Sequence, residues 1–397
     1  MIDFDFSTMV NSFINKDNLS NLSSLKEKVF QEFNASYMTG WTKRISDDQV
    51  NKILSVCEEV KSHSKCLVVI GIGGSFLGSY AVKEMLGKYF NDDFFSVIYA
   101  GTTLSSKYMK ELLEYLEGID FSINVISKSG TTMETTITYK LIRSLMEKKY
   151  SGDELTKRII ITTDAVKGAL REEINKVGYT SFEIPDDVGG RYSIMTAAHL
   201  FPLAFNIDIV KFIEGYYMGE DYRDDAFNYA LIRKCLFDFG KVVENYVVYE
   251  ENMHYFAEWL KQLFGETEGK NGKGILPIST IHTRDLHSLG QFIQEGNKIV
   301  FETFLKINNS ESISYNGKDL HYINNGVLES VRKAHFSGDV PSLEICLDAV
   351  NEKTVGSLMY FFMLSAAFSG FLFGIDPFNQ PGVEIYKKEI RENLGVL

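Results

Sequence analysis

The chain has 397 residues, of which 45% are hydrophobic and 24% are charged. These values are typical of a globular protein with about two domains and exclude collagen-like, disordered and disulfide-scaffold classes. Lys and Arg number 41 and Asp and Glu number 53, so the formal net charge is −12. An acidic surface repels phosphate backbones, which argues against nucleic acid as a partner. An anionic small substrate would need a local cationic pocket.

The first half of the chain alternates between short apolar runs and helix-length segments. Residues 1–60 are predicted to be helical. Strands are then predicted at 66–70, 96–100, 123–127, 158–162 and 181–184. Helices are predicted between them at 76–90, 105–117, 132–149 and 165–177. This alternation predicts an α/β fold with a parallel sheet flanked by helices, whose functional loops lie at the carboxyl ends of the strands.

A second series of the same style follows a mixed region. Its predicted strands are 242–249, 274–278, 299–305 and 343–349, with helices at 254–263 and 286–298. Residues 355–375 carry no charge and are long enough to span a bilayer. Glycines and serines dilute this stretch and no Lys/Arg bias flanks it, so we predict a buried helix and no membrane association. A short C-terminal helix is expected at 383–394.

Cysteine usage and the N-terminus bear on the cellular compartment. The four cysteines are scattered, with no Cys-x-x-Cys pair. This favours neither zinc binding nor a disulfide framework and fits a reducing cytosol. The N-terminal segment lacks a basic region followed by an apolar one, so no signal peptide is expected. We therefore expect a cytoplasmic protein.

Two predicted strands end in loops suited to anions. Gly71-Ile72-Gly73-Gly74-Ser75 follows the first strand and can bring backbone N–H groups close to a ligand. It fits neither a dinucleotide fingerprint nor a Walker A loop, which favours a sugar or sugar phosphate over NAD. Ser127-Lys128-Ser129-Gly130-Thr131-Thr132 places four hydroxyls and an ammonium in six residues. Thr131 and Glu134 have capping-box spacing, which predicts a helix start and a phosphate cradle there.

Four further residues are candidates on weaker patterns. Arg191 follows two glycines and could donate a fork of hydrogen bonds to an oxyanion, although a surface turn explains it equally well. Glu295 borders the polar stripe of a predicted amphipathic helix whose buried face is Leu286, Leu289 and Ile293. From spacing alone this stripe is a solvated face. His335 lies in a polar turn and Lys387 one turn into the last helix, patterns that are most often structural.

Taken together, these segments resemble the glucose-6-phosphate isomerase (phosphoglucose isomerase) family, in its short bacterial form. The resemblance is carried, in order, by VVIGIGGSFLG, NVISKSGTTMET, IPDDVGGRYS, DLHSLGQFIQEG, AHFSGDVPS and DPFNQPGVEIYK. It runs from about residue 60 to 390. The sequence departs from the usual family pattern in FSGDVP and FNQPGVE, and its connections around 205–235 and 308–325 are short.

The resemblance implies a fold of two flavodoxin-like sugar-isomerase (SIS) domains. We expect these at 61–195 and 196–375, with an N-terminal helical segment at 1–60 and a C-terminal helical tail at 376–397. It also implies a homodimer with shared active sites, no cofactor and no metal. The implied reaction interconverts glucose 6-phosphate and fructose 6-phosphate through a cis-enediol.

The resemblance also implies a role for each matched residue. The phosphate is expected at Ser127, Lys128, Ser129, Thr131 and Thr132. Gly74, Ser75 and Gln380 are expected to bind the sugar, and Arg191 to lie beside the developing oxyanion. Glu295 is implied as the proton-transfer residue. His335, supplied by the neighbouring subunit, and Lys387 are implied in opening the sugar ring.

Two other functions are weighed against this one. A non-catalytic sugar-phosphate sensor would need the phosphate loop but not Glu295, His335 and Lys387 together. A related isomerase could act on another phosphosugar, such as mannose 6-phosphate or an amino sugar. Assays with each sugar phosphate distinguish these alternatives.

Overall fold

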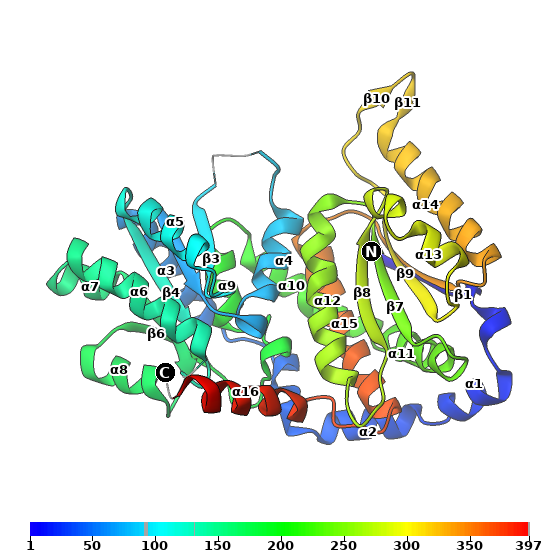
Figure 1. Cartoon of the computed structure of the whole chain (residues 1–397), viewed down its shortest axis with the longest axis horizontal. Helices are drawn as coiled ribbons and strands as arrows, with labels where there is room; N and C mark the ends of the chain where they lie inside the picture. Colours follow the sequence, from blue (N-terminus) through cyan, green and yellow to red (C-terminus); the bar gives the residue numbers. More distant parts are fainter. Residues whose placement is uncertain (91–93, 131, 396–397) are drawn as a thin grey trace. The chain divides into compact units, whose positions relative to one another are not determined.

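The computed structural model describes residues 1–90, 94–130 and 132–395 (Figure 1). The described chain divides into two compact units. Unit 1 contains Met1–Ser36, Glu84–Leu86 and the chain from Lys211 onward, and unit 2 contains Tyr37–Lys83 and Gly87–Val210. Each unit is built around its own five-stranded sheet.

The sheet of unit 2 is entirely parallel, with strand order β3-β2-β4-β5-β6. Its strands are β2 (Cys66–Ile70), β3 (Ser96–Ala100), β4 (Phe121–Ile126), β5 (Ile159–Asp164) and β6 (Thr180–Ile184). Counted within the unit, this order is 2-1-3-4-5, the flavodoxin-like arrangement. The three central strands, β2, β4 and β5, are buried along their whole length, as expected for a parallel sheet covered on both faces.

Helices alternate with these strands. They are α3 (Asp47–His63), α4 (Leu77–Leu86), α5 (Ser106–Glu117), α6 (Met133–Lys149), α7 (Gly152–Lys157), α8 (Ala169–Val177) and α9 (Ala197–Leu203). Short 3₁₀ turns occur at η2 (Tyr37–Thr42), η3 (Gly73–Ser75) and η4 (Gly190–Tyr192). Apolar residues of α5, α6 and α8 form one core with alternate residues of β2, β4 and β5. The core therefore fixes the strand ends from which the loops emerge.

The sheet of unit 1 has the order β1-β12-β9-β7-β8. Its strands are β1 (Ile2–Met9), β7 (Val243–Val248), β8 (Leu276–Ile281), β9 (Val300–Ile307) and β12 (Ser342–Leu347), with a separate hairpin of β10 (Ser314–Tyr315) and β11 (Lys318–Asp319). Strands β8, β7, β9 and β12 are parallel to one another. When these four are numbered along the chain, their order in the sheet is 2-1-3-4. The fifth, β1, is antiparallel and pairs with β12. The helical prediction for residues 1–60 is thus wrong at Ile2–Met9.

The helices of unit 1 include one that is apolar on all sides. The helices are α1 (Lys16–Ser23), α2 (Lys26–Ala35), α10 (Ile209–Met218, whose first two residues belong to unit 2), α11 (Arg223–Asp238), α12 (His254–Glu268), α13 (Gly290–Glu295), α14 (Leu320–Ser337), α15 (Glu352–Leu372) and α16 (Pro381–Leu394), with 3₁₀ turns η1 (Asn11–Phe13), η5 (Gly219–Tyr222), η6 (Glu251–Met253) and η7 (Arg284–His287). By length and composition α15 could cross a membrane, but 94% of its apolar window is buried inside the protein. It packs against α11 and α12, which confirms the predicted buried helix.

The structure confirms the α/β fold class, with one parallel and one mostly parallel sheet flanked by helices. The predicted strands at 66–70 and 96–100 coincide with β2 and β3. The helix predicted at 286–298 is wrong as a single element, because it is divided into η7 and α13. Leu289, predicted on its buried face, is 40% exposed, whereas Ile293 is buried.

Candidate active site

Two of the sequence-predicted loops meet at one edge of the unit 2 sheet. Strands β2 and β4 are parallel neighbours, and the GIGGS loop and the SKSGTT loop follow them directly. The strand order reverses between these two strands, so the loops flank the topological switch point. Open α/β sheets bind ligands in the crevice at this point. The topology of unit 2 thus brings both loops together at the position favoured for a ligand.

The loop after β4 is held by its own hydroxyl groups. Ser127 is 4% exposed, and its Oγ accepts a 3.1 Å hydrogen bond from Gly130 N–H and lies 3.4 Å from Thr132 Oγ1. Gly130 has a φ of 69°, a conformation that favours glycine. Thr132 is the N-cap of α6, and its side chain makes no capping hydrogen bond. Thr131, predicted as the cap, lies outside the described residues. The partial positive charge at the start of α6 therefore faces this loop.

Lys128 connects this loop to the segment that precedes Arg191. Its Nζ donates hydrogen bonds to the carbonyl groups of Pro185, Asp186 and Val188 at 2.9, 3.2 and 3.3 Å. These bonds use the three donors of the ammonium group. Ser129, its neighbour, is exposed. The contacts of Lys128 are those of a residue that fixes the loop, and its direct contact with phosphate stays a prediction.

The turn after β2 packs directly against the turn that carries Arg191. Gly74 lies in η3 and Gly190 in η4. A Cβ atom added to Gly74 would lie 2.3 Å from the Gly190 carbonyl carbon and 2.8 Å from Arg191 N. Only a residue without a side chain permits this approach. The glycine that the sequence suggested for a sugar contact therefore also joins two loops of the site.

We expect Gly74→Ala to reduce both stability and activity. The added methyl group would meet backbone atoms, which cannot rotate away, so η3 and η4 would have to separate. Overpacking of this kind costs about 1–3 kcal/mol. Thermal unfolding and kcat/KM check this result, with Gly326→Ala as the control, because a Cβ atom there meets nothing within 4 Å. A variant with wild-type stability and kcat/KM would contradict the close packing.

Arg191 is held inside unit 2 rather than on a surface turn. Its residue exposure is 3%, and its guanidinium carbon lies 5.4 Å from the centre of the Tyr192 ring. Tyr192 in turn stacks on Trp41, with ring centres 5.4 Å apart. A buried, packed guanidinium offers its donors in a fixed direction. The structure therefore holds Arg191 in a buried turn whose backbone packs against Gly74.

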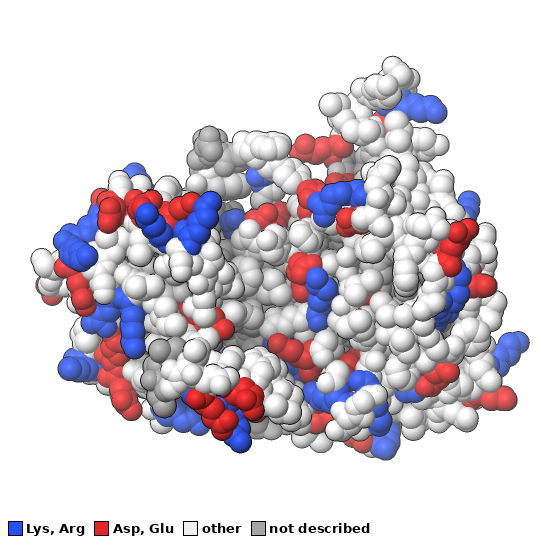
Figure 2. Space-filling view, viewed as in Figure 1, with Lys and Arg blue, Asp and Glu red and all other residues white. Residues whose placement is uncertain are grey.

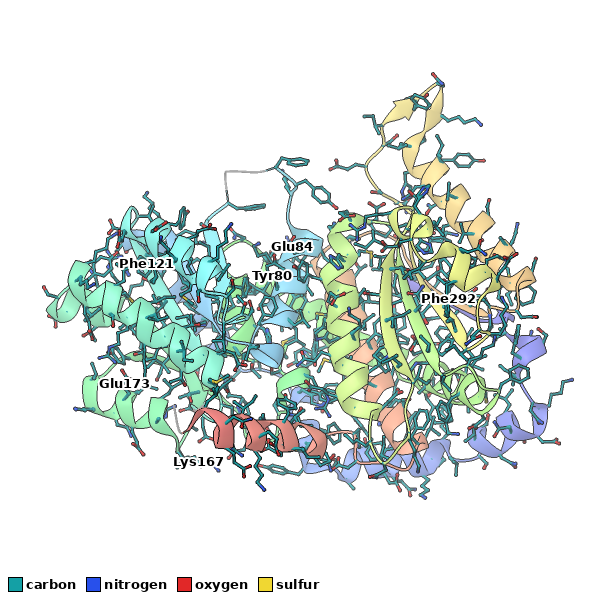
Figure 3. The ribbon with its side chains drawn as sticks, in the orientation of Figure 1. Tyr80, Glu84, Phe121, Lys167, Glu173 and Phe292 are labelled. Carbon is teal, nitrogen blue, oxygen red and sulfur yellow. The ribbon has the colours of Figure 1, made fainter. Side chains whose placement is uncertain are left out.

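Glu295 is the last residue of α13 in unit 1. Its side chain is exposed, and its Oε2 accepts a 2.7 Å hydrogen bond from Gln291 Nε2, one turn earlier. The adjacent Gln294 donates from Nε2 to the Ala334 carbonyl at 3.0 Å, which joins α13 to the end of α14. Phe292, labelled in Figure 3, is 49% exposed on the same short helix. A carboxylate and an apolar ring of this short helix are thus both exposed.

His335 lies near the end of α14 and is buried. Its exposed fraction is 4%, and its Nδ1 lies 2.7 Å from Oε2 of Glu302, a fully buried carboxylate of β9. A carboxylate on Nδ1 fixes the tautomer in which Nε2 is the basic nitrogen. Gln294 binds the residue before His335, so α13 and this part of α14 are neighbours. The polar turn predicted at His335 is thus wrong, because α14 continues to Ser337 and buries the residue.

The two C-terminal candidates lie on an exposed helix. Gln380 is the N-cap residue of α16, and Pro381 follows at the first helical position, so the helix begins two residues before the predicted start at 383. Lys387 donates from Nζ to Glu384 Oε1 at 2.9 Å. No residue of α16 in the described part is buried. The ion pair is local to the helix, so the roles of Gln380 and Lys387 stay predictions.

One residue of the site was missed from the sequence. His199, in α9, is 1% exposed and lies 2.7 Å from the Gly74 carbonyl oxygen and 3.0 Å from Ser193 Oγ. The signal that could have found it is its position, eight residues after Arg191, at the start of a short apolar helix. Apolar helices rarely bury a histidine without a specific polar partner.

Comparisons with known proteins agree with this architecture. The phosphoglucose isomerase family model matches residues 50–328 and 315–394. Glucose-6-phosphate isomerase of Staphylococcus epidermidis is 44% identical over 372 residues, covering 88% of this chain and 84% of that protein. Glucose-6-phosphate isomerase of Alkaliphilus metalliredigens is 40% identical, covering 99% of this chain and 96% of that protein.

Solved structures agree in fold. A hypothetical protein of Thermus thermophilus superposes with a TM-score of 0.86 at 24% identity, over 100% of both chains. A glucose-6-phosphate isomerase from Chlamydia trachomatis has a TM-score of 0.76 at 20% identity, covering 87% of this chain and 73% of that one. The fold and the matched loops define a sugar-phosphate isomerase of the α/β class. The chain belongs to the phosphoglucose isomerase family.

Proposed function

We infer from its family that this chain is a glucose-6-phosphate isomerase, which interconverts glucose 6-phosphate and fructose 6-phosphate in glycolysis and gluconeogenesis. The observation that carries the inference is that the family match, in two overlapping segments at 50–328 and 315–394, includes both switch-point loops, Arg191, Glu295 and Lys387. We further propose that the two units correspond to the sugar-isomerase domains expected at 61–195 and 196–375, and that the enzyme works in the cytoplasm without a cofactor.

The phosphate is proposed to bind at the start of α6. The helix has 17 residues and no side-chain cap from Thr132, so its first N–H groups and its dipole are oriented toward the SKSGTT loop. The exposed Ser129 and the half-buried Thr132 can add hydroxyl hydrogen bonds. We assign the phosphate to Ser127, Lys128, Ser129, Thr131 and Thr132. Binding energy from this distant group would hold the reacting carbons in place.

Glu295 is proposed to move the proton. It would take the C–H proton from one of the two reacting carbons and return it to the other, through a cis-enediol. Such a positioned base contributes about 10²–10⁴-fold to the rate. In the single chain the carboxylate is exposed, so substrate and the apolar ring of Phe292 would have to exclude water from it. The preorganised guanidinium of Arg191 would stabilise the enediolate oxygen.

Ring opening is assigned to His335 and Lys387. The basic Nε2 of His335, set by Glu302 on the other ring nitrogen, is suited to exchange a proton with the ring oxygen. We propose a homodimer in which this histidine serves the neighbouring subunit. Because His335 is 4% exposed, assembly would have to make its Nε2 accessible.

Mixing two inactive variants tests whether the active sites are shared. Glu295→Gln and His335→Asn are each expected to be inactive as homodimers. If the two residues come from different subunits, a hybrid dimer has one intact site, and refolding an equal mixture restores about a quarter of wild-type activity. No recovery in a mixture shown to contain hybrids would place both residues in one subunit.

A coupled assay tests the proposed function. Purified enzyme is supplied with fructose 6-phosphate, mannose 6-phosphate or glucosamine 6-phosphate, and formation of each aldose or ketose product is followed. Glucose 6-phosphate from fructose 6-phosphate, at the highest kcat/KM of the set, is the expected result. A higher kcat/KM for another sugar phosphate would favour a related isomerase. Tight binding with no turnover of any sugar would favour a sensor.

The proposal includes no nucleic-acid partner, and the distribution of surface charge supports this. Figure 2 shows Lys and Arg interspersed with Asp and Glu on the visible face, where neither sign forms an extended area. A phosphate backbone is usually bound by clustered basic side chains.

A further inference from the structure

His199 joins three segments of unit 2 that the sequence separates. Its Nδ1 accepts a 3.0 Å hydrogen bond from Ser79 N–H, at the start of α4. Because Nδ1 is an acceptor, the proton of the neutral ring is on Nε2, which donates to the Gly74 carbonyl at 2.7 Å. Ser193 Oγ lies 3.0 Å from the same Nε2. One imidazole therefore contacts the turn of Gly74, the start of α4 and the turn of Arg191.

The imidazole of His199 is neutral and is held in one orientation. Burial lowers the pKa of His199 to about 4, so the imidazole is neutral at the pH of a cell. Gly78 leaves room for it, since a Cβ atom there would lie 3.3 Å from Cε1 of the ring. Both ring nitrogens have partners, and a neutral buried histidine with both nitrogens satisfied is rigid.

Ser193 completes the connection between the two turns. Its Oγ lies 2.7 Å from the Gly190 carbonyl and 3.1 Å from the Gly74 carbonyl. Gly190 immediately precedes Arg191. The orientation of the Gly74 peptide and that of the turn carrying Arg191 are thus set by the same two side chains, His199 and Ser193.

We propose that His199 is a positioning residue, which holds the Gly74–Ser75 turn and the Arg191 turn in the mutual orientation that the isomerisation requires. The proposal rests on the proposed function, because it acts through Arg191. It predicts an effect on the transition state more than on substrate binding, since the oxyanion charge that Arg191 meets develops during the reaction. Displacement of a catalytic group by about 1 Å can cost about 10²-fold in rate.

Steady-state kinetics of three variants test this role. His199→Ala is expected to lower kcat by about ten- to a hundredfold with little change in KM. His199→Gln can still donate an N–H to Gly74 and is expected to recover most of kcat. His254→Gln is the matched control, because His254 is 38% exposed on α12 and has no bond to either turn in the described part of the chain. All values are normalised to the folded fraction measured by circular dichroism.

The connection to Arg191 is tested by a double-mutant cycle. Arg191→Lys and His199→Ala are expected to be non-additive in kcat, because the second change acts on a group already displaced. Additive effects, an unchanged kcat in His199→Ala, or no recovery in His199→Gln would overturn the proposal. If His199→Ala does not fold, Ser193→Ala takes its place in the cycle and is judged by the same criteria. A wild-type enzyme without isomerase activity would instead refute the proposed function.

Discussion

Glu295→Gln is expected to lower kcat by about 10²–10⁴-fold, while the protein stays folded and binds substrate. Glutamine has the shape of glutamate but cannot accept and return a proton. The side chain is exposed and its partner is Gln291, one turn earlier on the same helix, so the fold depends little on its charge. The measurement is kcat by coupled assay, together with thermal unfolding and binding of a non-isomerisable sugar phosphate.

The control is Glu311→Gln, the same change at an exposed glutamate outside the proposed site. It should keep wild-type kcat. A Glu295→Gln enzyme with undiminished kcat would show that another group moves the proton, and the assignment of the base would fail.

Arg233→Met is expected to lower the free energy of unfolding by about 3–5 kcal/mol. Arg233 is completely buried and binds two buried carboxylates: its Nε donates to Glu244 Oε2 at 2.7 Å, and its Nη1 to Glu268. Nη1 also donates to Ser369 Oγ at 3.0 Å. These contacts connect α11, β7, α12 and α15. Removing the guanidinium would leave two carboxylates in the core without a counter-ion.

Lys234→Met is the matched control on the same helix. Lys234 pairs with Asp238 Oδ2 at 2.6 Å near the surface, and pairs of this kind contribute about 0–1 kcal/mol. Chemical denaturation of both variants gives the comparison. If Arg233→Met cost no more than Lys234→Met, the core would tolerate the unpaired carboxylates, and the ion cluster would not be a stabilising element of unit 1.

The parallel strands of both sheets could be predicted because buried parallel strands are largely apolar runs, as in Cys66–Ile70. Strand β1 was missed, although Ile2, Phe4 and Phe6 alternate with polar residues in the pattern of an edge strand. Residues 286–298 have a helical pattern, but Ser288 and Leu289 leave regular helical geometry and divide the segment. Periodicity alone does not report such a local break.

The site was harder to predict because its contacts join distant parts of the chain. The SKSGTT loop could be predicted, since its residues are consecutive and follow a strand. The sequence could not indicate that Lys128 binds carbonyl groups more than fifty residues away, or that His335 faces Glu302. His199 was missed for the same reason, because its partners Gly74 and Ser79 lie in a different loop and helix. Tertiary packing decides which polar residues meet.

The central claim, that a carboxylate carries a proton between neighbouring sugar carbons, is tested most directly by isotope exchange. Fructose 6-phosphate is converted by the enzyme in D₂O, and the glucose 6-phosphate formed is analysed by NMR. Because a carboxylic acid exchanges its proton with solvent, we expect deuterium at C2 of the product, and its absence from control incubations with Glu295→Gln. Glucose 6-phosphate formed by Glu295→Gln at the wild-type rate, with the same deuterium content at C2, would contradict the mechanism.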